Sequence, residues 1–207
     1  MATKLFEGLK EFKKGDFEKH KELFSELKKG QNPHTFFIGC SDSRVVPNVI
    51  TKALPGELFV VRNIANVVPP YKASSESSYK CTASALEYAV EYLEVRNIVV
   101  CGHSNCGGLK ALFYDEKKLN KLPIVKRWLS LLDDVKKSVE HIEDGAFREW
   151  EIEHLNILKQ IDNLTTYPFV EKRFKEGKLN IFGWYYIIET GEVYNYNFDT
   201  QEFELIN

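Results

Sequence analysis

Apolar positions near the start of the chain recur with the period of an α-helix. Leu5, Leu9 and Phe12 follow an i, i+4, i+7 spacing, and a second apolar stripe begins after the pair Gly15-Asp16. That pair predicts a helix stop followed by an N-cap, so we expect two helices at an angle within residues 4–29. Their polar positions mix Lys with Glu, which disfavours a membrane-surface helix. The remaining interpretations are ordinary packed helices or an arm that packs on another subunit.

Three later stretches are continuously apolar rather than alternating. They cover residues 35–39, ending at Cys40, residues 58–61, and residues 98–101, ending at Gly102-His103. Continuous runs of this kind are typical of strands that are buried on both faces of a parallel sheet. We therefore expect three strands of one parallel sheet here.

The segments between and after these runs add helices to the pattern. Residues 76–94 predict a helix with Leu86, Val90 and Leu93 on one face, and residues 123–176 predict a longer helical region. Strand, helix and strand in that order favour an α/β architecture.

The end of the chain predicts strands again. Residues 179–188 form one long apolar run, residues 189–192 a turn, and residues 193–198 a hairpin partner. The predicted fold class is therefore α/β, with a central parallel β-sheet of about four strands. An antiparallel C-terminal strand extends this sheet, helices flank it, and an N-terminal helical arm precedes it.

Composition and charge narrow the classes of protein that fit. The 207 residues carry 28 Lys plus Arg against 30 Asp plus Glu, and 43% are hydrophobic, as in ordinary globular domains. The balanced charge argues against nucleic acid as a partner. No run approaches the ~20 apolar residues of a membrane span. We expect a single domain over residues 1–207, with an arm at 1–30 and a core at 31–207.

The cysteines bear on the compartment and on the chemistry. The charged N-terminus has no apolar core of a secretory signal, so we expect a cytoplasmic protein with reduced thiols. Unpaired cysteines are then more often metal ligands, nucleophiles or core residues than disulfides. The four are Cys40, Cys81, Cys101 and Cys106.

Two of these cysteines and one histidine fall where a ligand would bind. Cys40 ends the first predicted strand and His103 ends the third, and ligands bind beyond the carboxyl ends of parallel strands. Cys106 follows His103 by one turn, near a helix N-terminus that favours the thiolate. The three residues form a Cys₂His set suited to Zn²⁺. Three protein ligands leave a position open, as in catalytic zinc sites.

Neighbouring residues suggest what such a metal would do. Asp42 could reach the metal or a water on it, and Arg44 could pair with Asp42 and hold it in place. Cys101 lies within the third apolar run, and we expect it to be an inert core cysteine. As a fourth ligand it would instead make the site structural. Cys81 is expected to be a core or surface thiol.

At these residues the chain resembles the β-class carbonic anhydrases. The resemblance covers nearly the whole length, and its motifs match in residue type and order. It implies one Zn²⁺ per chain, held by Cys40, His103 and Cys106, with Asp42 and Arg44 as the family's Asp–Arg dyad. The motifs are Cys40-Ser41-Asp42-Ser43-Arg44, Pro55-Gly56-Glu57-Leu58-Phe59-Val60-Val61-Arg62-Asn63-Ile64-Ala65-Asn66 and His103-Ser104-Asn105-Cys106-Gly107-Gly108.

The resemblance also implies a substrate pocket and an assembly. The pocket glutamine falls on Gln31, and the apolar pocket falls on Phe59, Ile64 and Tyr88. Phe59 and Tyr88 typically come from the other subunit, so a homodimer or a larger oligomer built from dimers is expected. N-terminal helices that embrace the partner fit the arm over residues 4–29.

A bicarbonate-inhibited branch of the family carries a further Trp-Arg-Tyr set. Arg62 and Tyr186 align with two of its positions, but Phe37 stands at the third. The sequence therefore does not predict inhibition by bicarbonate.

The expected function is reversible hydration of CO₂ to bicarbonate and a proton by zinc-bound hydroxide. Asp42 would orient the hydroxide, while Gln31 and backbone N–H groups near Gly107 would donate to a substrate oxygen. One alternative is a hydrolase of COS or CS₂ on the same scaffold. Another is a non-catalytic protein in which Cys101 or Asp42 fills the fourth zinc position. A thiol-redox protein is the least favoured alternative, because the chain has no Cys-x-x-Cys motif.

Overall fold

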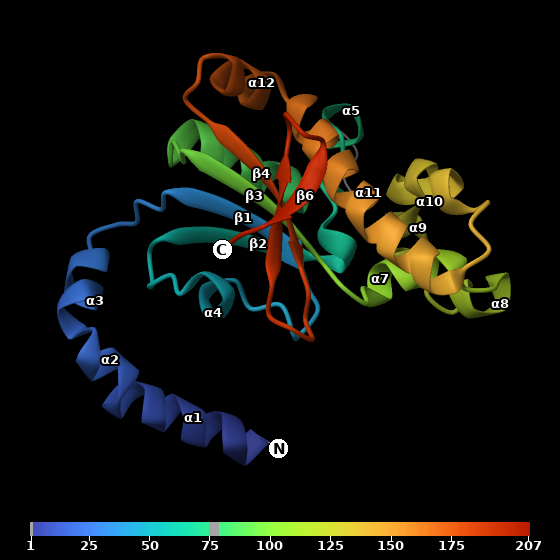
Figure 1. Ribbon diagram of the computed structural model, residues 1–207. Helices are drawn as coiled ribbons and strands as arrows, with labels where there is room; N and C mark the ends of the chain where they lie inside the picture. The colour runs from blue at the N-terminus through green and yellow to red at the C-terminus, as the bar shows by residue number, and fades with distance from the viewer. Residues whose placement is uncertain (1, 75–78) are drawn as a thin grey trace.

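A six-stranded sheet forms the centre of the protein. The computed structural model describes residues 2–74 and 79–207, and its strands are ordered β2-β1-β3-β4-β5-β6 (Figure 1). The first four strands in this order pair in parallel, whereas β5 pairs antiparallel with both β4 and β6. The predicted fold class is thus confirmed. The strands are β1 (Thr35–Cys40), β2 (Leu58–Asn63), β3 (Asn97–His103), β4 (Asn180–Tyr186), β5 (Val193–Asn197) and β6 (Glu202–Leu205).

The last strand, β6, extends the sheet beyond the predicted hairpin. It pairs only with β5 and its side chains are mostly exposed, so its sequence alternates charged and apolar residues without a continuous apolar run. Continuous apolar runs mark buried strands, so an exposed edge strand of this kind is not predicted from them.

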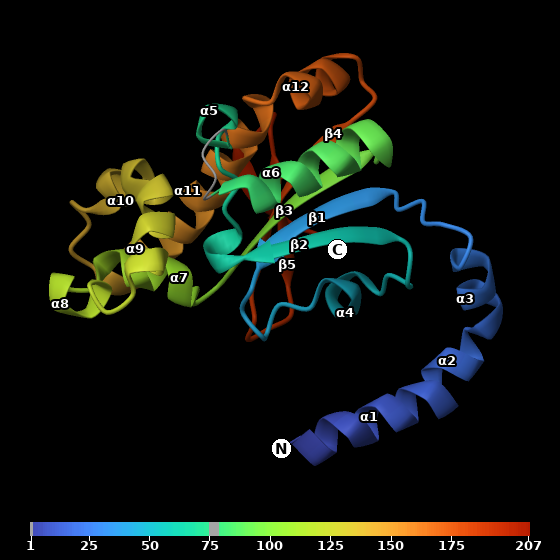
Figure 2. The same ribbon diagram turned by 180° about the vertical axis from the view of Figure 1, so that it is seen from behind.

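The N-terminal arm differs in detail from its prediction. It curves away from the body of the protein in both views (Figures 1 and 2) and consists of three helical pieces rather than two: α1 (Ala2–Lys14), α2 (Asp16–Lys19) and α3 (Lys21–Leu27). The break at Gly15 was predicted correctly, but Gly15 itself takes the N-cap position and Asp16 is the first helical residue. A second break at His20 was not predicted.

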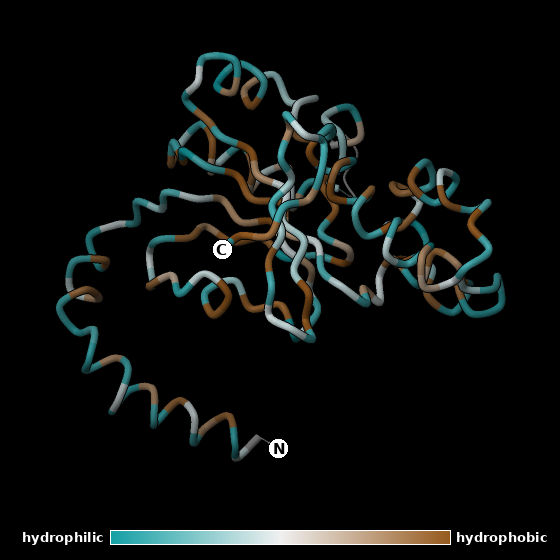
Figure 3. Tube along the Cα trace, viewed as in Figure 1, coloured by the Kyte–Doolittle hydropathy of each residue, from teal (hydrophilic) through white to brown (hydrophobic). Residues whose placement is uncertain are grey.

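The arm carries an apolar face that nothing in the described chain covers. Leu5, Phe6 and Leu9 on α1 are each more than 60% exposed. The hydropathy colouring of α1 alternates between brown and teal along the helix (Figure 3). Burial of such a face is the main source of stability for a surface helix.

The helices of the body pack mainly around the sheet (Figure 2). The expected helix over residues 76–94 appears as α6, which continues into a π-helical turn, η3; its expected start at Glu76 lies outside the described residues. The predicted helical region of residues 123–176 is confirmed. The helices are α4 (Pro47–Thr51), α5 (Tyr71–Ser74), α6 (Lys80–Glu87), η3 (Tyr88–Tyr92), α7 (Gly107–Lys110), α8 (Glu116–Leu119), α9 (Pro123–Leu129), α10 (Asp133–Val139), α11 (Gly145–Thr165) and α12 (Pro168–Lys175). Short 3₁₀ turns are η1 (Ile64–Asn66), η4 (Ala111–Phe113) and η5 (Ser130–Leu132).

Helix α11 lies directly against β3 and β4 because two strand positions lack a side chain. A Cβ atom at Gly102 would meet Ile157 at 2.7 Å, and one at Gly183 would meet Ile161 at 2.8 Å. Both isoleucines belong to the main core, together with apolar residues of β1, β3, α6 and η3. This close approach fixes α11 relative to the carboxyl ends of the strands.

Among residues 2–74 and 79–207, no helix is both long enough and apolar enough to cross a membrane.

The contact between Gly102 and α11 predicts a large effect of a small substitution. Gly102→Ala should lower the free energy of unfolding by about 1–3 kcal/mol, because the fully buried Ile157 has no room to move. Denaturant unfolding measures this change. Gly145→Ala is the matched control, since nothing lies within 4 Å of a Cβ at that position. Equal effects of the two substitutions would contradict the proposed close packing.

Candidate metal centre

Cys40, His103 and Cys106 meet at the carboxyl edge of the sheet. Cys40 ends β1, His103 ends β3, and Cys106 is the N-cap residue of α7. Because β1 and β3 are parallel neighbours, their last residues share one edge. The potential ligand atoms of the three residues all lie within 4.8 Å of one another, and all three residues are buried. The structure thus brings together the three residues that the sequence singled out.

The orientation of His103 suits a metal ligand. Its Nδ1 lies 2.9 Å from the backbone oxygen of Ser104, which can only accept, so Nδ1 carries the proton. The other ring nitrogen, Nε2, is buried and has no hydrogen-bond partner. A buried acceptor without a partner is costly unless something binds it. A metal at Nε2 would supply the missing interaction.

The two thiols form an electrostatically strained pair. Their sulfur atoms lie 4.0 Å apart. A hydrogen bond from the Cys106 thiol, only partly opposed by burial, lowers the pKa of Cys40 to about 4. The pKa of Cys106 is correspondingly raised, because its thiol donates to the Cys40 thiolate and because it is buried. Two thiolates at this distance require a cation between them. Two sulfurs and one imidazole nitrogen are a donor set that fits Zn²⁺.

The same thiolate changes the protonation of His103. Burial alone would lower the pKa of this imidazole, but the nearby Cys40 thiolate more than offsets that effect and raises it. A metal cation and a proton would therefore compete for Nε2.

Asp42 and Arg44 form a fixed pair beside the three ligands. Arg44 donates from Nε to Oδ1 at 2.9 Å and from Nη2 to Oδ2 at 2.7 Å, and its backbone N–H also donates to Oδ1. These hydrogen bonds hold the pKa of Asp42 well below its usual range. Oδ2 of Asp42 lies 4.0 Å from Nε2 of His103. The carboxylate therefore borders the metal position while Arg44 occupies both of its oxygens.

Backbone contacts secure this pair to its surroundings. Arg44 also donates to the backbone oxygen of Asn105, within the loop between His103 and Cys106. Arg62 on β2 donates to the backbone oxygens of Cys40 and Asp42 at 2.9 and 2.6 Å. The sequence assigned Arg62 only to the bicarbonate set and did not predict that it binds the backbone of Cys40 and Asp42.

Cys101 lies apart from the metal position. It is fully buried in a small cluster with Phe37 and Val99, and burial followed by the charge of Cys40 raises its pKa to about 12. It is not in the Cys40, His103 and Cys106 group that the described residues form. The prediction that Cys101 is a core cysteine is confirmed. Cys81 is an exposed thiol.

Glu153 is a site residue that sequence analysis missed. It is 4% exposed on α11, where Oε1 accepts from the backbone N–H of Cys106 at 2.9 Å and Oε2 accepts from Tyr185 at 2.8 Å. Burial raises the pKa of Glu153, while these two hydrogen bonds limit the rise. A signal was available: Glu153 shares the apolar face of α11 with Ile157 and Leu164 at helical spacing.

The residues expected around the substrate divide into two groups. Ile64 lies near the metal ligands, since a Cβ at Gly108 would be 2.8 Å from its side chain. Phe59 and Tyr88 contact each other, with ring centres 5.7 Å apart, but Phe59 pairs with Phe36 and not with the end of β1.

Phe59 is thus about 13 Å along the strands from the metal edge. Gln31 is exposed in the segment that leads into β1, also at the amino-terminal edge of the sheet. A single chain does not bring Gln31, Phe59 or Tyr88 to the metal ligands.

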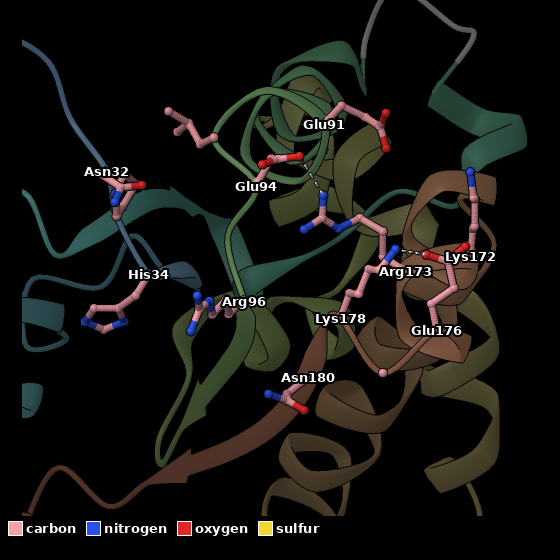
Figure 4. Close-up of a pocket in the computed structure, with 13 residues that line it drawn as sticks. Asn32, His34, Glu91, Glu94, Arg96, Lys172, Arg173, Glu176, Lys178 and Asn180 are labelled. Carbon is pink, nitrogen blue, oxygen red and sulfur yellow. Dashed lines mark ion pairs between the residues drawn. The ribbon is translucent and has the colours of Figure 1, made fainter.

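A hollow of about 930 Å³ lies at that amino-terminal edge (Figure 4). Its lining mixes cations such as Arg96 and Arg173 with acids such as Glu94, which lies 3.6 Å from Nη1 of Arg173. None of the three potential metal ligands lines it. The hollow and the group of Cys40, His103 and Cys106 therefore lie at opposite edges of the sheet.

Comparisons with known proteins agree with this geometry. A family model described as carbonic anhydrase matches residues 35–193. A carbonic anhydrase of Helicobacter pylori strain J99 is 44% identical, and the match covers 97% of this chain and 93% of that protein. A carbonic anhydrase of Synechocystis is 42% identical over 94% of this chain and 70% of that protein. The solved structure of the β-carbonic anhydrase CcaA superposes with a TM-score of 0.92 at 41% identity, covering 99% of each chain.

The ligand geometry predicts which side chains govern metal affinity. His103→Ala should weaken Zn²⁺ binding at least about 100-fold, because loss of a ligand exceeds the effect of losing a partner of a ligand. Metal analysis and competition with a chromophoric chelator measure this. Cys101→Ser is the control and should bind zinc as the wild type does. Comparable loss of zinc in both variants would contradict the assignment of Cys101 to the core.

Proposed function

The chain belongs to the β-class carbonic anhydrases, and from this premise we propose how its own residues carry out reversible hydration of CO₂ to bicarbonate and a proton. The observation that carries the proposal is the buried group of Cys40, His103 and Cys106 with the Asp42 carboxylate beside it. We assign one Zn²⁺ to this group. When bound there, zinc lowers the pKa of a water ligand and so supplies hydroxide at neutral pH.

Asp42 orients the nucleophile in this proposal. Each carboxylate oxygen has two lone pairs, and the contacts with Arg44 leave some of them free. Because Arg44 keeps Asp42 ionised, Asp42 can only accept a hydrogen bond. A hydroxyl group that donates to Asp42 has its lone pair directed away from the carboxylate, toward the substrate. Arg44 fixes the carboxylate and has no direct contact with CO₂.

CO₂ is small and uncharged, so it suits an apolar surface beside a few donors. We place it near Ile64, which is 40% exposed and adjoins the start of α7. The space beside Gly107 is open, and the first N–H groups of a helix have no intrahelical partner. A backbone N–H near Gly107 would donate to the substrate oxygen as charge develops on it. The Gln31 amide is the second proposed donor.

A second copy of the chain completes the pocket in this proposal. Gln31, Phe59 and Tyr88 lie at the other end of the strands from the metal ligands of their own chain, so we assign them to the site of a partner subunit. The uncovered apolar face of α1 offers a surface for the same partner. We propose a homodimer, alone or within a larger assembly. A solved chain from Sordaria macrospora, 30% identical to this one, is one of two β-carbonic anhydrases described as tetrameric.

The non-catalytic alternative requires a permanent fourth protein ligand. Cys101 is packed in a separate cluster, and both oxygens of Asp42 are held by Arg44. These contacts support an open fourth position, as a catalytic zinc requires.

We also propose a cytoplasmic location. All four cysteines are free thiols, and the two ligand sulfurs lie 4.0 Å apart. An oxidising compartment would favour a disulfide at the expense of the metal centre, whereas a reducing one keeps both thiols available.

The dyad predicts the effect of removing its arginine. Arg44→Ala should lower kcat/KM for CO₂ hydration about 10–100-fold at pH 8 with zinc content unchanged, because Asp42 loses its orientation. Stopped-flow measurement with a pH indicator tests this. The pKa of Asp42 should rise toward its ordinary value of about 3.9 in the variant, so the carboxylate stays ionised at pH 8. The loss there then reflects position, not charge.

Arg96→Ala, a change to an exposed arginine at the amino-terminal edge, is the control and should leave activity unchanged. A fully active Arg44→Ala enzyme would contradict the proposed role of the dyad.

Sharing of side chains between subunits predicts complementation. Tyr88→Ala damages the pocket that a chain lends to its partner, while His103→Ala removes a zinc ligand of its own site. A heterodimer of the two variants contains one complete site and should regain about half of the wild-type activity. Co-expression with two affinity tags isolates this heterodimer for assay. If Tyr88 served its own chain, the heterodimer would be no more active than the Tyr88→Ala homodimer.

A further inference from the structure

Glu153 is a buried carboxylate that takes no part in the chemistry described above. Burying a carboxyl group costs free energy unless each oxygen finds a hydrogen-bond donor. Here one donor is the Tyr185 hydroxyl on β4, and the other is the backbone N–H of Cys106. Within the described residues, no lysine, arginine or histidine forms an ion pair with it. The carboxyl group is thus committed to one tyrosine and one potential metal ligand.

We propose that Glu153 is a positioning residue of the metal centre, which holds the backbone of Cys106 so that its sulfur faces Cys40 and His103. This inference rests on the metal centre assigned above. It adds a residue, 47 positions away in the sequence, that acts on the metal only through the ligand it holds.

Glu153 is held by helix α11, which carries it, and by Tyr185 on β4. Because Gly102 has no side chain, α11 lies close to β3, and this places Glu153 beside the end of that strand. Tyr185 is opposite Gly102 in the register of β3 and β4 and is 5% exposed. Its hydroxyl engages Oε2, which leaves Oε1 directed at the nitrogen of Cys106. The sheet and the helix together therefore set the position of the acceptor.

The loop that carries Cys106 needs such a support. Asn105 adopts a left-handed conformation, with φ of 58°, which turns the chain sharply before Cys106. The N–H of Cys106 points toward Glu153, and its sulfur lies 4.0 Å from that of Cys40. Holding the backbone nitrogen of Cys106 limits the positions that its sulfur can take.

A cavity adjoins Cys106 on the side that faces Glu153. A cavity of about 290 Å³ is lined by both Cys106 and Glu153, together with apolar residues of α7 and α11 such as Leu109 and Ile152. Because there is free space on this side, the hydrogen bond to Glu153 adds to the packing that holds Cys106 elsewhere. The same space allows a shorter side chain to be accommodated without a clash.

Two substitutions separate position from charge. Glu153→Asp keeps the charge but withdraws the carboxylate by about 1.5 Å, beyond reach of the Cys106 nitrogen. Glu153→Gln removes the charge but keeps an acceptor oxygen at the same reach. The full-length protein is tested for Zn²⁺ affinity by chelator competition and, after Co²⁺ substitution, for its visible absorption spectrum, which reports ligand geometry. Neither readout depends on CO₂ hydration.

We expect Glu153→Asp to weaken Zn²⁺ binding about 10–100-fold and to change the Co²⁺ spectrum. Glu153→Gln should stay within about threefold of the wild type, since a neutral acceptor retains the geometry. Ile157→Val is the control for general loosening of α11, because Ile157 packs against Gly102 and belongs to a different buried cluster from Cys40 and Cys106. It should lower the unfolding midpoint and leave the metal affinity unchanged.

Three outcomes would overturn the inference. The first is a Zn²⁺ affinity of Glu153→Asp equal to that of the wild type. The second is a Zn²⁺ affinity that is lower in Glu153→Gln than in Glu153→Asp, which would assign the effect to charge. The third is a loss of Zn²⁺ affinity in Ile157→Val as large as that in Glu153→Asp. A wild-type protein that binds neither Zn²⁺ nor Co²⁺ would instead refute the metal centre itself. The two failures are therefore distinguishable.

Discussion

The parallel pairing of β1 with β3 is the constraint on which the metal centre depends. It brings the last residue of one strand, Cys40, to the same edge as the last residue of the other, His103. Cys106 then needs only the short turn into α7 to join them. Helix α11 stabilises this edge from one face, because Gly102 and Gly183 allow it to approach the strands closely. The core and the site are thus positioned by the same contacts.

The electrostatics of the site follow from burial. Two thiols 4.0 Å apart in a buried position cannot both ionise without a cation, and the imidazole of His103 presents an unpartnered nitrogen to the same point. Asp42, in contrast, already has its cation in Arg44. The two thiols and the imidazole thus lack a cation, whereas the Asp42 carboxylate is already paired with one. Arg62 and Glu153 hold the backbone around these groups from two other directions.

The two edges of the sheet carry different residues. The carboxyl edge carries the potential metal ligands and Ile64, while the amino edge carries Gln31 and Phe59, with Tyr88 packed against Phe59. One chain cannot fold its two sheet edges onto each other. A site that needs both edges must therefore join two chains, and the exposed apolar face of α1 is consistent with such an assembly.

Local patterns in the sequence were sufficient for β1 to β5, for the α/β class and for the three residues that meet at the carboxyl edge of the sheet. Continuous apolar runs mark buried strands, and chemically distinctive residues stood at their ends. The sequence could not reveal that Arg62 holds the backbone of Cys40 and Asp42, or that Glu153 reaches Cys106, which is 47 residues away. These features depend on which backbone groups are left without a partner once the chain has folded. Every residue except proline carries the same main-chain donor and acceptor, so only the tertiary structure decides which side chain satisfies them.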